Sequence, residues 1–335
     1  MKMWHKVGAS LLVSGLAAAA LPHAAMAQSV VKIDGSSTVF PIAEAVAEDF
    51  QISKRGKVRV TVGIGGTGGG FKKFCRGETD ISNASRPILK EEMDLCREAG
   101  VKYIELPVAF DALTVVINKE NTWAKTMTVA DLKKMWEPGA QGRITKWSQV
   151  RSNWPNQPIM LFGAGTDSGT FDYFTEAVNG RAKASRSDYT ASEDDNVLVQ
   201  GVESNKNAIG YFGYAYYAGH KDKMQAVAVD AGKGKGAVAP SAEAVIDGSY
   251  QPLSRPLFIY VRDTAAAKAE VREFVEFFLT KGPELVKEVG YVPLPAQAYT
   301  TAREHFTSKK LGTVFGGVPE VGVTIDNLLA REAKL

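Results

Sequence analysis

The sequence contains few histidines, and it has no large excess of basic or acidic residues. Only four of its 335 residues are histidines, and His5 and His23 lie within the first 27 residues. The remaining pair, His220 and His305, argues against a multi-histidine metal site or a histidine-rich catalytic centre. The 40 basic and 37 acidic residues give a formal charge of +3, without any dense basic run. We therefore expect no nucleic-acid partner.

Long hydrophobic runs are also missing. The longest run, Val7 to Leu21, is too short to span a bilayer; it follows Lys2 and Lys6 and leads to Ala25-Met26-Ala27. This pattern predicts a secretory signal peptide over residues 1–27 that is cleaved after Ala27, and hence export to the periplasm. A membrane anchor is the alternative interpretation.

Cysteine is scarce, and both cysteines follow the predicted cleavage site. Cys75 and Cys96 are too far apart in the sequence for a CxxC redox motif. In an oxidising compartment they favour a disulfide that closes a loop of about 22 residues, with a stabilising effect of about 3 kcal/mol. Two buried free thiols are the alternative.

The 45% hydrophobic content indicates a globular chain, and the length favours two domains. Alternating Val58, Val60, Val62 and Ile64 predict a strand, and short apolar runs separated by helical patterns recur along the chain. The fold class is therefore α/β, with mostly parallel or mixed sheets. Further predicted strands are 30–33, 103–107, 113–117, 159–162 and 257–261; predicted helical segments begin near 42, 93, 132, 171 and 265.

Three predicted strands end in turns rich in Gly, Ser and Thr that lead into helices. These turns are Asp34 to Thr38, Gly65 to Gly70 and Gly163 to Thr170. A helix N-terminus presents free N–H groups and a partial positive charge, glycine permits close approach, and hydroxyls add donors. Ordinary helix capping explains one such turn, and it is also our interpretation of Asp194-Asp195-Asn196. Three turns together favour a shared oxyanion ligand.

The second turn also fits the dinucleotide pattern GxGxxG, from Gly63 to Gly68. That pattern requires an acidic residue at the end of the next strand, whereas Asp80 precedes the short run 81–83. A GxxxxGK[ST] phosphate loop is absent from the sequence. We therefore do not expect a nucleotide cofactor.

The order and spacing of several motifs resemble the phosphate-binding proteins of Pst-type ABC importers, a family of periplasmic substrate-binding proteins. The motifs extend along nearly the whole chain after residue 27. They are 34–41 (DGSSTVFP), 65–70 (GGTGGG), 79–87 (TDISNASRP), 165–171 (GTDSGTF), 208–211 (AIGY) and 252–257 (PLSRPL).

This resemblance implies a periplasmic binding protein fold of type II, with two lobes, two crossover strands and one phosphate in the cleft. Lobe I would comprise 28–108 and 254–335, and lobe II 109–253. The implied partners are inorganic phosphate and a membrane ABC permease. We expect a monomer that needs no cofactor or metal and is not an enzyme.

The resemblance also implies a set of phosphate ligands, carried over motif by motif. Two positions depart from the best-known members: Arg86 stands where they have an aspartate, and Ala164 where they have an arginine. We expect Arg86 to supply the positive charge and Asp167 to accept the phosphate proton, although a surface cation and a helix cap remain alternatives. The predicted ligands are Ser37, Thr38, Val39, Gly66, Thr67, Arg86, Asp167, Ser168, Gly169 and Thr170.

Two other functions remain open. The same fold could bind another tetrahedral oxyanion, namely sulfate, molybdate or a phosphonate. A secreted phosphohydrolase would need a nucleophile with a base, and His220 and His305 lie outside the three turns. If Arg86 binds the anion, Arg86→Ala should weaken phosphate binding by more than about 2 kcal/mol.

Overall fold

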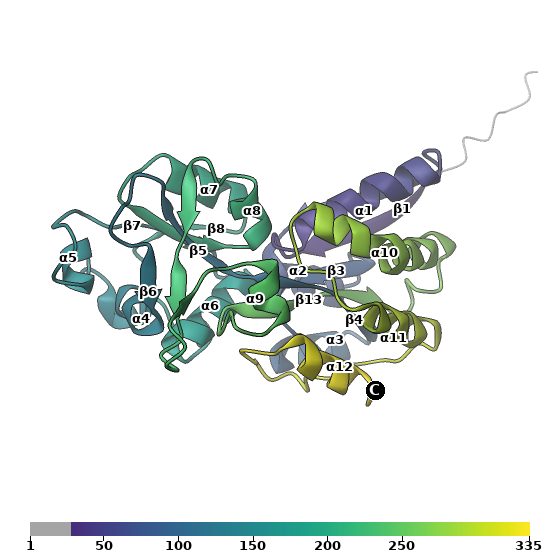
Figure 1. Cartoon of the computed structure of the whole chain (residues 1–335). Helices are drawn as coiled ribbons and strands as arrows, with labels where there is room; N and C mark the ends of the chain where they lie inside the picture. Colours follow the sequence, from purple (N-terminus) through teal and green to yellow (C-terminus); the bar gives the residue numbers. More distant parts are fainter. Residues whose placement is uncertain (1–27) are drawn as a thin grey trace, which may run out of the picture.

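The computed structural model describes residues 28–335, so the predicted signal peptide (1–27) lies outside the described residues. The chain forms two lobes side by side, each built around a five-stranded sheet with flanking helices (Figure 1). The expected two-lobed α/β fold is confirmed. None of the helices within 28–335 has both the length and the apolar composition needed to cross a bilayer.

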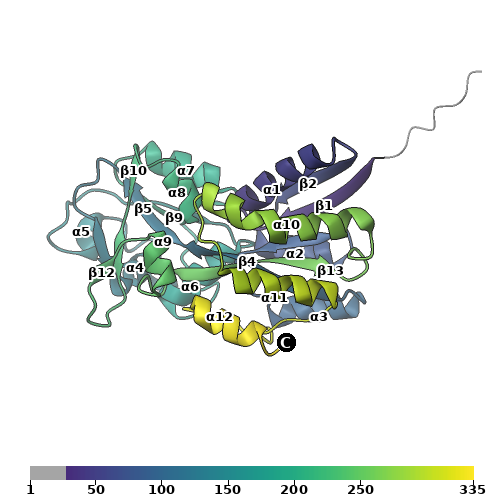
Figure 2. The ribbon, with the colours of Figure 1, turned by 45° about the vertical axis from the view of Figure 1, so that its right-hand side comes forward.

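The first lobe contains both ends of the described chain. Its sheet has the order β2-β1-β3-β13-β4, in which β1 runs parallel to β2 and β3, while β13 is antiparallel to β3 and β4. The C-terminal helices α10 and α11 pack against this sheet (Figure 2). The elements are β1 (Ser29–Gly35), α1 (Phe40–Ser53), β2 (Val58–Ile64), α2 (Gly66–Cys75), β3 (Ile81–Ala84), α3 (Lys90–Glu98), β4 (Tyr103–Ala112), β13 (Ser254–Arg262), α10 (Ala269–Glu288), α11 (Ala296–Thr307) and α12 (Ile325–Glu332).

The second lobe is formed by the middle of the chain. Its main sheet has the order β10-β5-β9-β7-β8, and a small sheet has the order β12-β11-β6. The elements are β5 (Thr114–Asn118), β6 (Thr126–Thr128), α4 (Val129–Trp136), the 3-10 helix η1 (Pro138–Ala140), α5 (Trp147–Val150), β7 (Met160–Ala164), α6 (Gly169–Asn179), β8 (Thr190–Ser192), α7 (Asp195–Glu203), β9 (Ala208–Phe212), α8 (Tyr214–Ala218), β10 (Met224–Ala226), β11 (Ala228–Asp230), β12 (Ala237–Val238) and α9 (Ala242–Ile246).

The chain passes between the two sheets at two adjacent points. It leaves the first sheet after β4 through Leu113, and it returns through Leu253 into β13. These two crossings are hydrogen-bonded to each other, because the N–H of Leu113 donates to the carbonyl of Leu253 at 2.8 Å. The predicted lobe boundary at 108/109 falls inside β4, and that at 253/254 falls at the start of β13. Both boundaries stay predictions.

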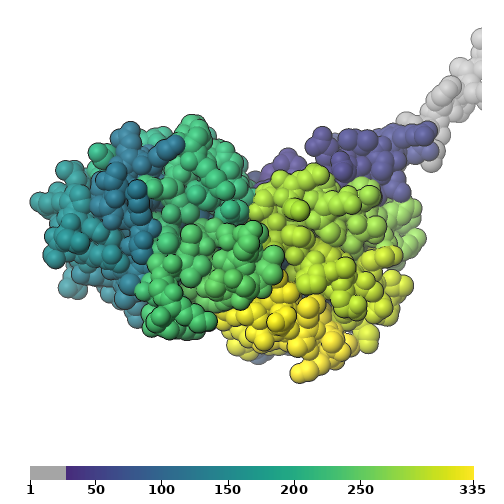
Figure 3. All heavy atoms as spheres, viewed as in Figure 1, coloured from purple at the N-terminus to yellow at the C-terminus, as the bar shows by residue number. Residues whose placement is uncertain are grey.

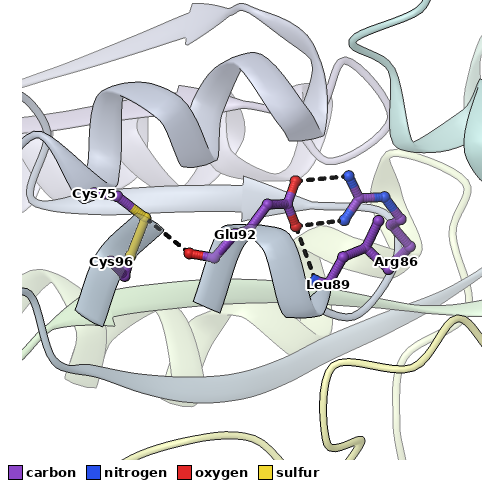
Figure 4. The surroundings of a disulfide bond; sticks show 5 residues. All are labelled: Cys75, Arg86, Leu89, Glu92 and Cys96. Atoms are coloured by element: carbon purple, nitrogen blue, oxygen red, sulfur yellow. Dashed lines mark hydrogen bonds and ion pairs between the residues drawn. A yellow bond between two sulfur atoms is a disulfide. The ribbon is translucent and has the colours of Figure 1, made fainter. Parts of the chain in front are cut away.

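The predicted disulfide between Cys75 and Cys96 is confirmed, with Cα atoms 4.4 Å apart. It joins the last residue of α2 to α3 (Figure 4). The sulfur of Cys75 also lies 3.5 Å from the carbonyl oxygen of Glu92. The disulfide therefore fixes the helix that carries Glu92, a residue that contacts the predicted site.

The molecular surface is indented along its upper outline where the two lobes meet (Figure 3). The junction contains the ends of β1, β3, β4 and β7, and the N-termini of α1, α2, α6 and α7 start close to it. Strand-to-helix turns of both lobes therefore face one another. This is the arrangement in which a small ligand contacts several helix N-termini together.

Candidate functional site

The first turn, between β1 and α1, lies at the lobe junction. Ser37 and Thr38 are buried, with 1% and 0% of their surface exposed, and Val39 is fully buried. The N-terminus of α1 has no side-chain cap. Near this end of α1, the N–H of Val39 donates to Ser36 Oγ at the long distance of 3.4 Å. Ordinary capping therefore does not explain the hydroxyls of Ser37 and Thr38.

The second turn depends on glycine for its close contact with the other lobe. Gly66 has φ +71°, and a Cβ atom there would lie 2.5 Å from the carbonyl oxygen of Asp167. The N–H of Gly68 donates to that same oxygen at 2.8 Å. Thr67 follows Gly66 and is completely buried. The glycine run thus allows α2 to begin directly against the second lobe.

The third turn leads into α6 and is capped by a side chain. Ser168 Oγ accepts a hydrogen bond from the N–H of Thr170 at 3.1 Å, which is a standard N-cap. A Cβ atom at Gly169 would lie 2.4 Å from Thr67 Oγ1 and 2.7 Å from Ser85 Oγ. Only glycine fits here, because hydroxyls of the first lobe touch the start of α6.

The hydroxyls of the three turns meet in the interior. Thr38 Oγ1 lies 3.0 Å from Thr170 Oγ1, and these two residues come from different lobes. Thr67 Oγ1 lies 3.3 Å from Ser85 Oγ and accepts from the N–H of Ser85 at 3.2 Å. All four side chains are fully buried. The structure therefore brings the predicted residues of all three turns together at one place between the lobes.

Arg255 supplies a positive charge to these hydroxyls, and the sequence analysis did not identify it. Its Nη2 atom lies 3.2 Å from Thr38 Oγ1 and 3.0 Å from Thr170 Oγ1. Its Nε and Nη2 atoms donate to Asp111 Oδ2 at 3.1 and 2.9 Å. Arg255 and Asp111 are both completely buried. The available signal was its place in the quoted motif 252–257, just before the predicted strand 257–261.

Arg86, the predicted cation, is buried beside the second turn and is bound by two carboxylates. Its Nη1 and Nη2 atoms donate to Glu92 at 2.8 Å each (Figure 4), and its Nε atom donates to Asp172 Oδ2 at 2.8 Å. Nη1 also donates to the carbonyl of Pro87. A guanidinium has five N–H groups. These bonds use the N–H of Nε, both N–H groups of Nη1 and one of the two N–H groups of Nη2.

The pKa of Arg86 reflects these neighbours. Burial alone would lower the pKa, but Glu92 and Asp172 outweigh burial and hold it above the ordinary value. Arg86 therefore remains charged. One N–H of Nη2 is left for another acceptor, and Nη2 lies 3.8 Å from the position of a Cβ atom at Gly68. A role for Arg86 in anion binding stays a prediction.

Asp167, the predicted proton acceptor, lies at the rim of the junction. Its Oδ1 atom pairs with Lys72 Nζ at 2.7 Å, and 44% of its side chain is exposed. Its backbone N–H donates to Glu193 Oε1 at 3.0 Å. The structure thus places the Asp167 carboxylate in an exposed interlobe ion pair with Lys72. Its role as proton acceptor stays a prediction.

Asp195 is a second residue that the sequence analysis did not assign to the site. The interpretation of 194–196 as a helix start is confirmed, because Asp194 Oδ1 accepts from the N–H of Asn196 at 2.9 Å. Asp195 itself is fully buried, and its Oδ1 atom accepts from Ser37 Oγ of the other lobe at 3.2 Å. Burial raises the pKa of Asp195 to about 7, against the opposing effect of Arg255 and Ser37.

Both histidines of the described chain lie away from the three turns. His220 Nδ1 is 2.8 Å from the carbonyl oxygen of Tyr216. His305 Nδ1 is 3.2 Å from Glu332 Oε2, between α11 and α12. The ring nitrogens of both histidines thus contact groups other than Ser168 and Thr170.

Comparison with known proteins places the chain in a family. A family model described as a PBP superfamily domain matches residues 22–281. Protein SphX of Synechococcus elongatus is 54% identical over 325 residues, covering 96% of this chain and 95% of SphX. The phosphate-binding protein PstS of Staphylococcus saprophyticus is 37% identical over 308 residues, covering 90% and 93% of the two chains.

Solved structures give the same result. A possible phosphate binding protein from Planctomyces limnophilus is 50% identical, with a TM-score of 0.62 and coverage of 84% of this chain and 98% of that chain. A substrate-binding protein from Clostridium perfringens, solved with bound phosphate, is 27% identical, with a TM-score of 0.67 and coverage of 80% and 100%. The chain therefore belongs to the PBP superfamily and, within it, to the family that contains PstS and SphX.

Proposed function

We propose that this protein binds one inorganic phosphate ion between its lobes and delivers it to the permease of an ABC importer. The observation that carries the proposal is the meeting of Thr38, Thr67 and Thr170 beside the buried guanidinium of Arg255. The names of the related PstS proteins and the phosphate bound in the Clostridium perfringens structure support phosphate as the ligand. The predicted signal peptide supports a periplasmic location for this function.

The chemistry of the junction suits a buried dianion. A multiply charged ion leaves water only when several donors replace its hydration shell, and charge-assisted hydrogen bonds are the strongest of these. Hydroxyls of Thr38, Thr67 and Thr170 would supply donors, together with the N–H groups of Val39, Gly66 and Gly169, whereas the single hydroxyl hydrogen of Ser37 is donated to Asp195. Arg255 supplies positive charge, and Arg86 adds its remaining N–H from the side of the second turn.

Donors from both lobes also account for delivery. An ion that contacts both lobes stabilises the closed arrangement by its greater affinity for it, so release requires the lobes to separate. The lobes that move are, in our proposal, 28–108 with 254–335 and 109–253. Their motion is centred on the two hydrogen-bonded crossings at Leu113 and Leu253. The proposed molecule acts as a monomer, as a receptor and not as an enzyme.

Calorimetry on phosphate-stripped protein tests this function. We expect one phosphate per chain with a Kd in the micromolar range or tighter, which corresponds to about 8 kcal/mol or more. Thr170→Val removes a hydroxyl from the junction and should weaken binding about 10- to 100-fold. Thr175→Val is the matched control, because Thr175 lies on the same helix and its hydroxyl donates to the carbonyl of Phe171 within α6. Wild-type protein that gives no saturable heat with phosphate would exclude the proposal.

A further inference from the structure

Tyr173 connects three segments of the chain through one buried hydroxyl. It lies on α6 of the second lobe, and 3% of its surface is exposed. The hydroxyl donates to the carbonyl of Ser254 at 2.6 Å, with the carbonyl oxygen of Pro252 3.0 Å away, and it accepts from the N–H of Gly322 at 3.0 Å. Burial raises the pKa of Tyr173, so the hydroxyl keeps the proton that it donates.

The partners of Tyr173 belong to the first lobe or to the crossing that leads into it. Ser254 is the first residue of β13, a strand of the first sheet, and Pro252 lies on the crossing before that strand. Gly322 lies in residues 313–324, between α11 and α12, which we call the C-terminal strap. The hydroxyl of Tyr173 therefore joins a helix of the second lobe to the first sheet and to the strap.

The C-terminal strap is held on the first lobe on both sides of Gly322. Before Gly322, the N–H of Val314 donates to Glu105 Oε1 at 3.1 Å, and the carbonyl of Gly317 accepts from the N–H of Lys90 at 2.9 Å. After Gly322, α12 packs against α11. The strap is therefore a part of the first lobe that bonds to a side chain of the second.

The C-terminal strap has further contacts at the edge of the second lobe. Gly322 has φ +77°, and a Cβ atom there would lie 2.9 Å from Gln251 Oε1. Thr324 Cγ2 lies 3.6 Å from the position of a Cβ atom at Gly248, which follows α9. The strap thus reaches the second lobe near α6 and α9 (Figure 1).

Tyr173 also lies beside the proposed phosphate site. It is on the helix that begins at the third turn and carries Thr170. The guanidinium carbon of Arg255 lies 5.5 Å from the centre of the Tyr173 ring, within the range of a cation–π contact. Nη2 of the same guanidinium lies 3.0 Å from Thr170 Oγ1. Tyr173 therefore contacts the machinery of the site without belonging to the proposed ligands.

We propose that Tyr173 is a positioning residue that stabilises the closed arrangement of the lobes through its bonds to Ser254 and to the C-terminal strap. This inference rests on the proposed function. When the lobes separate, α6 moves away from β13 and from the strap, and Tyr173 loses these bonds. Bonds made only in the closed arrangement strengthen the binding of a ligand that requires closure, although they do not touch that ligand.

The test compares Tyr173→Phe with Tyr299→Phe in the full chain. Tyr299 is the matched control: its buried hydroxyl donates to the carbonyl of Val108 at 2.7 Å and accepts from the N–H of Leu294 at 3.2 Å, all within the first lobe. Tyr173→Phe should raise the Kd for inorganic phosphate about 5- to 30-fold, mainly through faster dissociation. Tyr299→Phe should change that Kd by less than about twofold while lowering the urea midpoint by a similar amount. Calorimetry gives the Kd, and stopped-flow measurement gives the dissociation rate.

A second pair of variants tests the C-terminal strap without changing Tyr173. Gly322→Ala places a methyl group against Gln251 and should move the strap away from the second lobe, which raises the phosphate Kd. Gly316→Ala is its control, because Gly316 also has a positive φ, +64°, but has no atom within 4 Å of the position of a Cβ atom. It imposes a similar backbone strain without the interlobe contact, and the Kd should stay unchanged. This pair replaces the first if Tyr173→Phe does not fold.

Each outcome decides a different point. If wild-type protein gives no saturable heat with phosphate, the proposed function fails and the inference fails with it. If wild-type protein binds phosphate and Tyr173→Phe changes the Kd no more than Tyr299→Phe does, the inference alone is wrong. A higher Kd with an unchanged dissociation rate would also overturn it. If Tyr173→Phe weakens binding and Gly322→Ala does not, the hydroxyl acts through Ser254 and the role of the strap is excluded.

Discussion

Arg86 and Arg255 are two buried arginines at the lobe junction, and their surroundings differ. Arg86 is bound by Glu92 and Asp172, and the disulfide between Cys75 and Cys96 fixes the helix that carries Glu92 (Figure 4). Among the described residues, Asp111 is the one carboxylate paired with Arg255, which directs Nη2 at the hydroxyls of Thr38 and Thr170 and donates from Nη1 to the carbonyl of Gly169 at 3.4 Å. Protein acceptors therefore engage four of the five N–H groups of Arg86, whereas Arg255 faces the hydroxyls of two of the three turns.

The two regions also differ in the acids that β4 provides. Glu105 is linked to the segment that follows Arg86. It accepts a hydrogen bond from the hydroxyl of Tyr260, and that hydroxyl accepts one from the N–H of Ile88. Within residues 28–335, Glu105 has no cation among its hydrogen-bond partners. Asp111, six residues further along the strand, pairs with Arg255. Burial raises the pKa of both acids, but Arg255 opposes the shift of Asp111.

The largest difference should come from removing each arginine in turn. Arg255→Met leaves Asp111 buried without its cation, which should reduce the free energy of unfolding by about 3 to 5 kcal/mol and abolish measurable phosphate binding. Arg86→Met should weaken phosphate binding less, by about 2 kcal/mol, because only one of its N–H groups is free. Urea unfolding and calorimetry measure the two effects.

If the two substitutions weaken phosphate binding equally, the proposed difference between Arg86 and Arg255 is wrong. A larger loss for Arg86→Met would show that Arg86 is the principal cation, as the sequence predicts. If Arg255→Met does not fold, the double variant Arg255→Met with Asp111→Asn removes the unpaired charge and leaves the binding comparison intact.

The disulfide should stabilise the Arg86 region without contributing directly to ligand contacts. Replacing Cys75 and Cys96 together by serine should reduce the free energy of unfolding by about 3 kcal/mol, the value for a loop of this length. Phosphate affinity should fall by less than about threefold, since neither sulfur touches the three turns. Denaturant unfolding with and without reductant checks the first value. A loss of affinity as large as that of Arg86→Met would show that α3 positions the site.

Glu105 should make stability depend on pH. Burial raises its pKa from 4.5 to about 7. Between these values the folded protein holds a proton that the unfolded chain releases, so the free energy of unfolding should fall as pH rises, by at most about 1.4 kcal/mol per pH unit. Asp195, whose pKa burial also raises to about 7, adds a slope of the same sign. Glu105→Gln should therefore reduce the slope without abolishing it, as measured by urea unfolding between about pH 5 and pH 7. An unchanged slope would mean that Glu105 is ionised throughout.

The smallest effect should come from Lys72. Its ion pair with Asp167 joins the two lobes, but the two side chains are 55% and 44% exposed. Lys72→Ala should therefore change stability by less than about 0.5 kcal/mol and phosphate affinity by less than about twofold. Calorimetry at low and high salt measures this. A tenfold change in affinity would show that the rim pair, and not the buried hydroxyls, controls closure.

The local features of this protein could be predicted because neighbouring residues determine them. The α/β pattern follows from hydrophobic periodicity, and the disulfide from two cysteines in an exported chain. The turns at Ser37, Gly66 and Gly169 were recognisable from their glycines and hydroxyls, since backbone geometry at a turn restricts which residues fit.

The positions of Arg255 and Asp195 could not be found in this way. Arg255 contacts Asp111 across 144 positions and Thr38 across 217, and Asp195 contacts Ser37 across 158. Nothing in the flanking residues distinguishes Arg255 from an arginine at the edge of a sheet, or Asp195 from a helix cap such as Asp194. Motif membership does not separate them either, because Arg86, Asp167 and Arg255 all lie within the quoted motifs.

By itself, the sequence determined the two-lobed α/β class, the disulfide and the three turns with free donors, because each depends on short-range periodicity, backbone geometry or the chemistry of a compartment. Only the tertiary structure decided which charged side chains face the hydroxyls. That choice depends on burial and on partners from distant segments, and a carboxylate beside a guanidinium changes what that guanidinium can bind.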